Sequence, residues 1–410
     1  MNVRRGALAL LFLAASCVTA PQAERFTLPG GRSTTAAEID ASATRMMDAA
    51  HVPGLGLALI VDGRVAYVKS YGVRNATTNA PLDIDTVMYG ASLTKAAFAY
   101  MVMTLVDEGV VDLDKSIADY LPKPLPEYEK YKDLANDPRW GQFTFRMMLS
   151  HSTGMPNFRW LNDDEKLDIK YPPGSRFVYS GEGINLAQFV LEEGLHRNVG
   201  QLMRERVFDR FGMTRTSMTW RADFGADLAD GHDEAGAAVP HKQRGGVRAA
   251  GSMDTTVSDY AKFLAGVLRG DGLSATSKQT MLSSQIAIVS PTEFPSHWPG
   301  ETDVNRRIDL GYGLGWGVYR SPYGPAFFKE GNGDGENNIA MGFQSSRTGL
   351  LMLANSANGE KMFEPMIDSV FGEACMPWFW QNYIPWDKPD LRLPEARNHP
   401  PSACDPPPAR

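Results

Sequence analysis

The spacing of hydrophobic positions changes its period early in the chain. Two β-branched and apolar runs, 55–61 and 64–71, flank Asp62-Gly63, a dipeptide typical of a two-residue β-hairpin turn. Helical spacing follows at 89–108, which carries a broad apolar face and stops before Gly109. The pattern therefore predicts an antiparallel hairpin followed directly by a long helix.

Helical patterns then dominate to about residue 285, and strand patterns return after it. Helices are expected at 145–149, 183–194, 199–211 and 256–268, between loops that contain proline and glycine. Strands are expected at 312–319, 338–343 and 349–355, the last two as a hairpin that turns near Ser346 and Arg347. This order predicts an α/β fold with an antiparallel sheet flanked by helices. Its two halves, about 38–88 and 286–372, meet across a mostly helical insertion at 89–285, where we expect a cleft.

The first 23 residues have the layout of a secretory signal peptide. Arg4 and Arg5 precede an apolar run at 7–15, which is too short to span a bilayer, and small residues follow. The residues before Cys17 also resemble a lipoprotein signal, so lipid attachment at Cys17 and ordinary cleavage near Ala20 both stay open. We therefore expect an exported protein, either periplasmic or membrane-anchored.

Composition and net charge limit the classes of molecule that the protein is expected to bind. The 410 residues are 43% hydrophobic and 22% charged, which is ordinary for a globular protein. Lys and Arg number 41 against 48 Asp and Glu, so the net charge of −7 favours neither nucleic acid nor an anionic membrane. A small molecule or peptide is the expected substrate, and the oligomeric state stays open.

Cysteine and histidine spacing gives no support for a cofactor. Cys375 and Cys404 could pair in an oxidising compartment or remain as two thiols. The chain contains no Cys-x-x-Cys and no His-Glu-x-x-His, and its histidines are scattered. We therefore expect neither a metal nor another cofactor.

Candidate chemistry begins with Ser92-Leu93-Thr94-Lys95, the only Ser-x-x-Lys of the chain. A spacing of three residues in a helix places the hydroxyl and the amine on one face. A lysine with a lowered pKa can take the serine proton, and the helix N-terminus favours a nearby oxyanion. A helix-start serine beside a solvated lysine would give the same four residues.

The sequence around this motif decides between the two interpretations. Val87-Met88-Tyr89-Gly90-Ala91-Ser92-Leu93-Thr94-Lys95, with the helix after it, resembles the serine β-lactamase and penicillin-binding-protein family, and its nearest relatives look like class C β-lactamases, D-amino-acid peptidases and related esterases. The likeness continues through 148–156, 173–180, 251–263 and 353–359. It implies a β-lactamase/transpeptidase-like catalytic domain within 24–372. The proline content predicts a C-terminal tail at 373–410, extended from about residue 387.

The resemblance also implies roles for individual residues. Ser92 would be the nucleophile that forms an acyl-enzyme, and Lys95 would share its proton. Tyr179, at the position of the family's Tyr-x-Asn tyrosine, would activate Ser92 together with Lys95 and protonate the leaving group.

The family's third motif matches best at Phe328-Lys329-Glu330-Gly331-Asn332. Lys329 would supply positive charge to Tyr179 or to a substrate carboxylate. The backbone N–H of Asn332, after Gly331, would join that of Ser92 in an oxyanion hole. Glu330 is unusual at its position, and it could either neutralise Lys329 or face away from it along the strand.

Three further positions qualify the resemblance. Gly181 stands where the family has an asparagine that contacts the substrate, so β-lactam turnover is disfavoured against ester or amide hydrolysis. Glu182 is expected to be a loop carboxylate in water. His151 is expected to be structural, because Lys95 and Tyr179 already supply the base and no Ser-His-Asp signature is present.

The sequence therefore predicts an exported serine hydrolase that acts on small esters, amides or D-amino-acid-containing peptides. A class C-like β-lactamase or a D,D-peptidase is the alternative on the same residues. A non-catalytic cell-envelope binding protein on this fold is a second alternative, but such a protein does not need a serine, an amine and a phenol at these positions.

Overall fold

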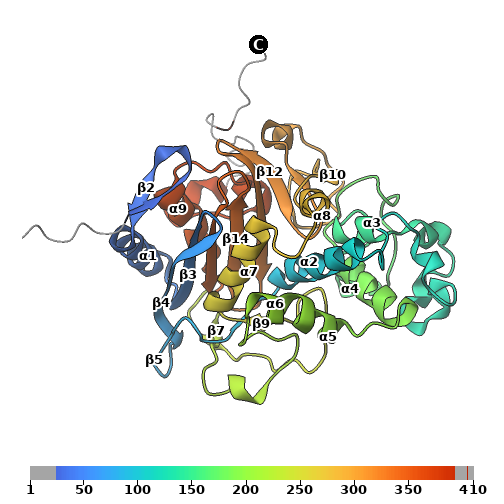
Figure 1. Ribbon diagram of the computed structural model, residues 1–410, viewed down its shortest axis with the longest axis horizontal. Helices are drawn as coiled ribbons and strands as arrows, with labels where there is room; N and C mark the ends of the chain where they lie inside the picture. The colour runs from blue at the N-terminus through green and yellow to red at the C-terminus, as the bar shows by residue number, and fades with distance from the viewer. Residues whose placement is uncertain (1–24, 393–403, 405–410) are drawn as a thin grey trace, which may run out of the picture.

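A nine-stranded antiparallel sheet forms the centre of the molecule (Figure 1). The computed structural model describes residues 25–392 and residue 404, so the expected signal segment and Cys17 lie outside the described residues. The strand order is β10-β11-β12-β13-β14-β15-β3-β4-β5. The strands are β3 (Gly54–Val61), β4 (Arg64–Asn75), β5 (Ala80–Pro81), β10 (Ile286–Ala287), β11 (Gly311–Tyr312), β12 (Gly317–Ser321), β13 (Gly324–Asn332), β14 (Asn337–Phe343) and β15 (Thr348–Ala354).

The two ends of the sequence meet in the middle of this sheet. Strand β15 pairs with β3, and Leu351 lies opposite Ala58. The hairpins expected at Asp62-Gly63 and near Ser346 and Arg347 are both present, as the β3–β4 and β14–β15 connections. The predicted α/β fold with an antiparallel sheet is therefore confirmed.

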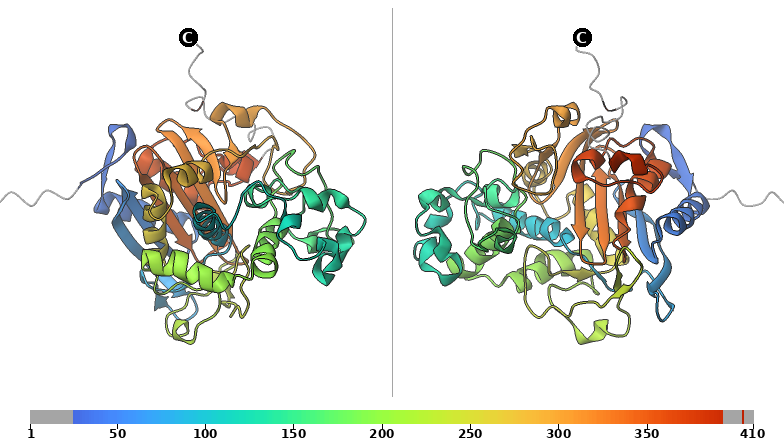
Figure 2. Two further views of the ribbon diagram at one scale, coloured as in Figure 1. Left: turned by 45° about the vertical axis from the view of Figure 1, so that its right-hand side comes forward. Right: turned by 180° about the vertical axis from the view of Figure 1, so that it is seen from behind.

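Helices cover both faces of the sheet. On one face lie α2 (Leu93–Asp107) and α7 (Val257–Arg269), and on the other α1 (Ala36–Ala50) and α9 (Glu360–Phe371), as the two views of Figure 2 show. Along β3, Leu57 and Leu59 enter the core beneath α1 and α9, whereas Ala58 and Ile60 enter the other core. Because both faces are buried, this strand reads as a continuous apolar run rather than an alternating one.

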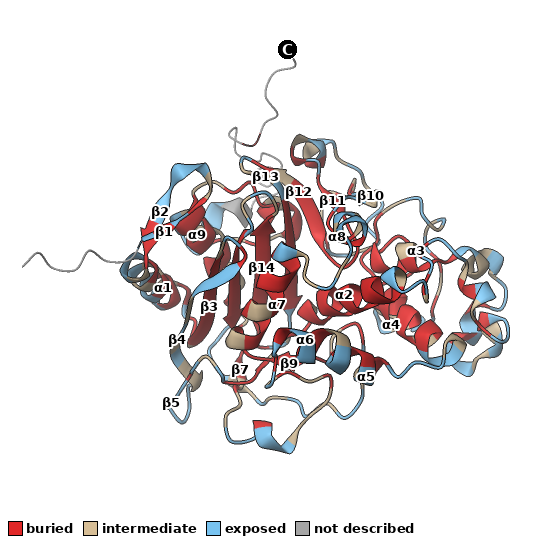
Figure 3. Cartoon of the chain, viewed as in Figure 1, coloured by how far each residue is buried: buried red, intermediate tan, exposed pale blue. Residues whose placement is uncertain are grey.

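Helix α2 runs through the interior. All its residues from 93 to 105 are buried, as Figure 3 shows, and most of them are apolar. It ends at Asp107, and Gly109 follows with a φ of 69°, as the predicted stop requires. The first turn of α2, which carries Ser92 and Lys95, therefore sits in the interior, next to the sheet.

The remaining helices are short and lie mostly between β5 and β10, with α10 near the C-terminal end. Two of the predicted helices are interrupted: 183–194 is α4 followed by a π-helical turn (Val190–Gly194), and 199–211 is α5 and α6 around another (Arg204–Phe208). The short helices are α3 (Phe145–Leu149), α4 (Gly181–Phe189), α5 (Val199–Met203), α6 (Asp209–Phe211), α8 (Ala275–Met281) and α10 (Trp378–Gln381). Short strand pairs complete the described part: β1 (Arg25–Thr27) with β2 (Ser33–Thr35), β6 (Met88–Tyr89) with β9 (Asp254–Thr255), and β7 (Gly231–His232) with β8 (Ala238–Val239).

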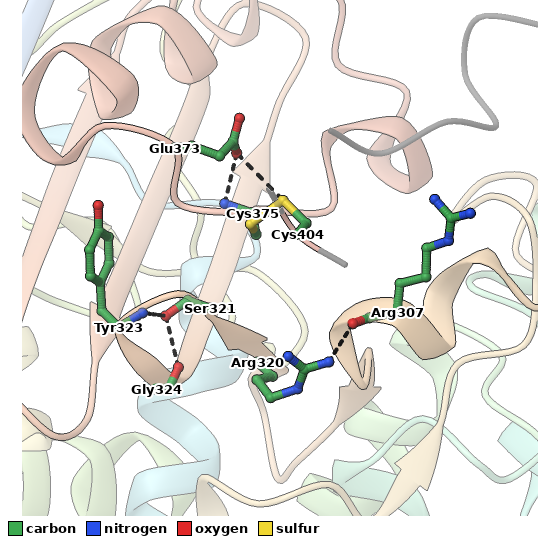
Figure 4. The surroundings of a disulfide bond; sticks show 8 residues. All are labelled: Arg307, Arg320, Ser321, Tyr323, Gly324, Glu373, Cys375 and Cys404. Atoms are coloured by element: carbon green, nitrogen blue, oxygen red, sulfur yellow. Dashed lines mark hydrogen bonds between the residues drawn. A yellow bond between two sulfur atoms is a disulfide. The ribbon is translucent and has the colours of Figure 1, made fainter. Parts of the chain in front are cut away.

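The first part of the predicted proline-rich tail, before the stretch expected to be extended, is folded. Residues 378–381 form α10, and Trp380 is fully buried in the core beneath α9. Cys375 and Cys404 form a disulfide bond, with Cα atoms 5.6 Å apart (Figure 4). The aromatic side chains of this segment explain its folding, because they bury apolar area. None of the described helices is both long enough and apolar enough to cross a membrane.

Candidate active site

Ser92 immediately precedes α2, at a strained point of the backbone. Ala91 before it has a φ of 45°, a left-handed conformation that residues other than glycine rarely adopt. Strand β13 passes close by: a Cβ atom on Gly331 would lie 3.2 Å from the Ser92 nitrogen and 2.7 Å from the Gly90 carbonyl oxygen. Gly331 therefore allows the end of β13, with Asn332, to approach the backbone N–H of Ser92.

Lys95 lies one helical turn from Ser92 and contacts its hydroxyl. Its Nζ atom is 2.8 Å from the Ser92 Oγ atom and donates to the Ala250 carbonyl oxygen at 2.6 Å. The side chain is buried, and burial, together with the positive charge of Lys329, lowers the pKa of Lys95 well below its usual value. A neutral amine in this position can donate to Ala250 and accept the hydroxyl proton of Ser92.

Tyr179 lies between the two lysines. Its ring centroid is 5.1 Å from the Lys95 Nζ atom and 5.0 Å from that of Lys329, and its Oη atom accepts from Lys329 at 3.3 Å. Burial raises the pKa of Tyr179 to about 12, although Lys329 and a hydrogen bond with Ser92 act to lower it. The phenol therefore keeps its proton at neutral pH and can donate it.

His151 packs against the ring of Tyr179. Its ring lies 4.4 Å from that of Tyr179, and its Nδ1 atom accepts from the backbone N–H of Ser180 at 3.1 Å. Burial, reinforced by Lys95 and Lys329, lowers the pKa of His151 well below its usual value. A neutral imidazole held this way packs against Tyr179, and its structural role stays a prediction.

Two carboxyl groups, those of Glu330 and Glu293, interact with Lys329. Only Glu330 was singled out from the sequence. The ammonium group of Lys329 forms an ion pair with Glu330, the next residue of β13, so Glu330 does not face away from it. Glu293, from the loop between β10 and β11, is also buried and forms a side-chain hydrogen bond with Glu330. Burial, and then the Glu330 carboxylate, raise the pKa of Glu293 well above its usual value, so Glu293 keeps a proton.

The charge of Lys329 survives its burial. Burial acts to lower the pKa of Lys329, but the Glu330 carboxylate acts most strongly against it, and the pKa is raised well above its usual value. The ammonium group of Lys329 binds to groups of the protein itself, since its described partners are Glu330 and Tyr179. No signal in the sequence marked Glu293, because it approaches Lys329 only through the tertiary structure.

Gly181 is closely covered by an aromatic side chain. A Cβ atom on Gly181 would lie 2.5 Å from the Cε1 atom of Phe158, whose ring stacks on Trp160 at 4.3 Å. Phe158 therefore occupies space that the family's asparagine side chain would need. Gly181 and Phe158 therefore fit together, because Phe158 can lie here only if residue 181 has no side chain. The family resemblance did not predict this contact.

The expectation that Glu182 lies in water is wrong. Its side chain is only 6% exposed and pairs with Arg159, whose Nε and Nη2 atoms donate at 3.0 and 2.9 Å. The backbone N–H of Arg159 donates to the same carboxylate at 3.1 Å. These bonds compensate the burial of the charge and hold the segment with Phe158 and Trp160 against the start of α4.

A cavity of about 200 Å³ opens onto Ser92. It is lined by Tyr89, Ala91, Ser92, Phe158, Trp160, Asn185, Arg248, Ala250, Gly251 and Asn332. A second cavity, of about 210 Å³, shares Tyr89, Arg248 and Asn332 with the first, so the two form one cleft. A larger cavity of about 510 Å³ beside α5 contains neither Ser92 nor the two buried lysines. Volume alone would therefore misplace the site.

The fold and this site together define a class. A serine at the start of a buried helix, an amine and a phenol beside it and a sheet strand closing the cleft are the features of the active-site-serine proteins with a penicillin-binding fold. The chain belongs to the β-lactamase family, whose model matches residues 39–371. This family includes serine hydrolases, among them esterases, β-lactamases and D-alanine carboxypeptidases.

Individual relatives are distant. The chain is 27% identical over 299 residues to unguisins hydrolase ungD' of Aspergillus campestris, and the match covers 64% of this chain but 54% of that protein. It is 25% identical to lovastatin esterase of Penicillium rubens, over 77% of this chain and 80% of the esterase. The structure of D-alanine carboxypeptidase AmpC from Burkholderia cenocepacia superposes with a TM-score of 0.65 at 20% identity, covering 82% of this chain and 98% of that one, which shows the shared fold.

Proposed function

We propose that this protein is an exported serine hydrolase that forms an acyl-enzyme on Ser92 with small esters, amides or D-amino-acid-containing peptides. The observation that carries the proposal is the buried Lys95 amine 2.8 Å from the Ser92 hydroxyl, with its pKa lowered by burial. A neutral amine at hydrogen-bond distance is what a serine needs to become a nucleophile.

The residues divide the reaction between them. Lys95 accepts the Ser92 proton as Oγ attacks the substrate carbonyl, and the backbone N–H groups of Ser92 and Asn332 stabilise the oxyanion. Tyr179 donates its proton to the leaving alcohol or amine and regains one from Lys95. Water then attacks the acyl-enzyme with the same groups in reverse, which releases the acid and restores Ser92.

The environment of Gly181 favours ester and simple amide substrates. Phe158 fills space near Gly181, so the asparagine that would contact an amide side chain is absent and its place is apolar. The similarity to a lovastatin esterase, which covers most of both chains, supports the same direction. A β-lactamase or D,D-peptidase activity stays the alternative, because Ser92, Lys95, Tyr179 and Lys329 suit it equally.

Export is supported by two independent features. The first 23 residues have the composition of a signal peptide, with Cys17 as the site of a lipid anchor if a lipoprotein signal operates. The Cys375–Cys404 disulfide suits an oxidising compartment. Both features are consistent with a periplasmic or envelope-anchored protein.

Parallel assays of a short-chain nitrophenyl ester and a chromogenic cephalosporin test the function, with mature protein and Ser92→Ala. We expect ester turnover that disappears in the variant, and little cephalosporin cleavage. Rapid cephalosporin cleavage would favour the β-lactamase alternative. If well-folded protein turned over neither compound and a fluorophosphonate did not label Ser92, the non-catalytic binding protein would replace the hydrolase.

A further inference from the structure

The cleft beside Ser92 contains one cation that the protein itself does not use. Arg248 lines both parts of the cleft and is exposed. Within residues 25–392, no hydrogen bond or ion pair holds its guanidinium group, although its backbone N–H donates to Ser252 at 3.0 Å. A guanidinium group presents five donors in a planar fork, which matches a carboxylate.

The neighbouring cations are already engaged. Arg244 lies over the Tyr89 ring at 3.4 Å and contacts Asp254 at 3.3 Å, and Lys242 forms an ion pair with Asp334 at 2.6 Å. Lys329 is buried against Glu330 and Tyr179 and does not line the cleft. A substrate anion that enters the cleft therefore meets Arg248 rather than Lys329.

A second polar group lies in the same cavity. The Asn185 side chain, on α4, accepts from the backbone N–H of Ala250 at 3.2 Å through its Oδ1 atom. This bond fixes the amide and leaves its NH₂ group as a donor for a ligand. Phe158 and Trp160 give the cavity an aromatic portion. Arg248 and Asn185 are thus donors in a cavity that is partly apolar and partly cationic.

We propose that the substrate of this hydrolase carries a carboxylate, which Arg248 binds with help from Asn185, while the apolar part of the substrate packs near Phe158 and Trp160. The proposal rests on the proposed function of Ser92. It makes Arg248 a specificity determinant rather than part of the proton-transfer machinery. The anion-binding role expected for Lys329 thereby moves to a residue on the segment before α7.

Two matched esters test this assignment. 4-Nitrophenyl hexanoate is neutral, whereas mono-4-nitrophenyl adipate has the same chain length and ends in a carboxylate. We expect Arg248→Met to lower kcat/KM for the adipate ester about tenfold or more, as loss of a charge-assisted hydrogen bond predicts, and to change the hexanoate value little. Arg45→Met, the same substitution on the exposed side of α1, is the control and should change neither value. Higher ionic strength should reduce the preference for the adipate ester.

A binding measurement separates this inference from the hydrolase proposal. In Ser92→Ala, calorimetry with phenylacetate and its neutral amide reports on the cleft without catalysis. Tighter binding of phenylacetate that weakens about tenfold on adding Arg248→Met supports the anion site, even if no ester is hydrolysed and the proposed function fails. Equal losses for both esters, or phenylacetate binding that does not depend on Arg248, would overturn the inference while leaving Ser92-dependent hydrolysis intact.

Discussion

Lys95 and Lys329 are two buried lysines on either side of one tyrosine, and their charges differ. Both side chains are almost fully excluded from water, and both Nζ atoms lie close to 5 Å from the Tyr179 ring centroid, at 5.1 and 5.0 Å. Yet the pKa of Lys95 is lowered well below its usual value, whereas that of Lys329 is raised well above it. Burial is therefore not what distinguishes them.

The difference lies in their partners. Lys95 has a hydroxyl and a carbonyl as neighbours, so nothing close by compensates its charge. Lys329 has the Glu330 carboxylate, and the charge that it keeps further lowers the pKa of Lys95. Glu330 thus holds Lys329 as a fixed cation, while burial and that cation keep Lys95 a neutral base, two states that a catalytic serine requires next to one phenol.

Replacing each lysine in turn should give the largest difference in activity between the two positions. We expect Lys95→Met to lower kcat/KM for a neutral ester by about 10³, because a general base contributes between about 10² and 10⁴. Lys329→Met should cost less, since it removes a charge near Tyr179 rather than the base itself. Single-turnover acylation rates measure both, with Ser92→Ala as the floor. If Lys95→Met stayed within tenfold of the wild type, Lys95 would not be the base.

The carboxyl groups around Lys329 test the second half of the comparison through stability. Glu330→Gln alone should lower the free energy of unfolding by only about 1 to 3 kcal/mol, because Glu293 can lose its proton and pair with Lys329 instead. The double variant with Glu293→Gln leaves a buried unpaired ammonium group and should cost about 3 to 5 kcal/mol. Urea unfolding measures these values, and simple additivity of two small effects would argue against the shared role.

The pH dependence of hydrolysis tests the lowered pKa of Lys95. Because only neutral Lys95 can accept the proton, kcat/KM should rise with pH through the lowered pKa of Lys95 and reach a plateau well below pH 10.5. No decline from Tyr179 is expected below about pH 10, since its pKa is raised to about 12. Glu330 and Glu293 both raise the pKa of Lys95. The double variant Glu330→Gln and Glu293→Gln should therefore lower this pKa and move the rising part of the pH profile to lower pH. A shift to higher pH in a kinetic titration of a neutral ester would contradict this assignment.

Replacing an exposed lysine should have the smallest effect on the free energy of unfolding. Lys242 pairs with Asp334 at 2.6 Å, but the two side chains are 67% and 71% exposed. Water and salt screen such a pair, so Lys242→Met should change the free energy of unfolding by less than about 1 kcal/mol. Urea unfolding at two salt concentrations checks this value. A loss as large as that of the double carboxyl variant would mean that burial does not separate these lysines.

Local sequence was informative wherever the interacting groups are neighbours along the chain. The hairpin turn at Asp62-Gly63, the apolar helix expected at 89–108 and the three-residue spacing of Ser92 and Lys95 each depend on short-range geometry. The structure contains the turn and the spacing, and the helix over 93–107, after Tyr89 in β6. Glu182 was misjudged because Arg159 approaches it only when the loop folds back over α4. The folding of residues 378–381 was not predicted, since Trp380 finds its apolar surroundings in the core beneath α9 only through the tertiary structure.

The order of residues along the chain was thus enough to predict the fold class, the family resemblance and the serine, amine and phenol of the candidate site. Only the tertiary structure decided how these groups are charged and which cation faces the cleft. Glu293 approaches Glu330 and Lys329 from a separate loop, and Phe158 closes the space above Gly181. The guanidinium group of Arg248 lines the cleft without a hydrogen bond or ion pair to the described residues. The physical reason is that a pKa depends on burial and on charges within a few ångströms, and both are properties of positions in space rather than of order along the chain.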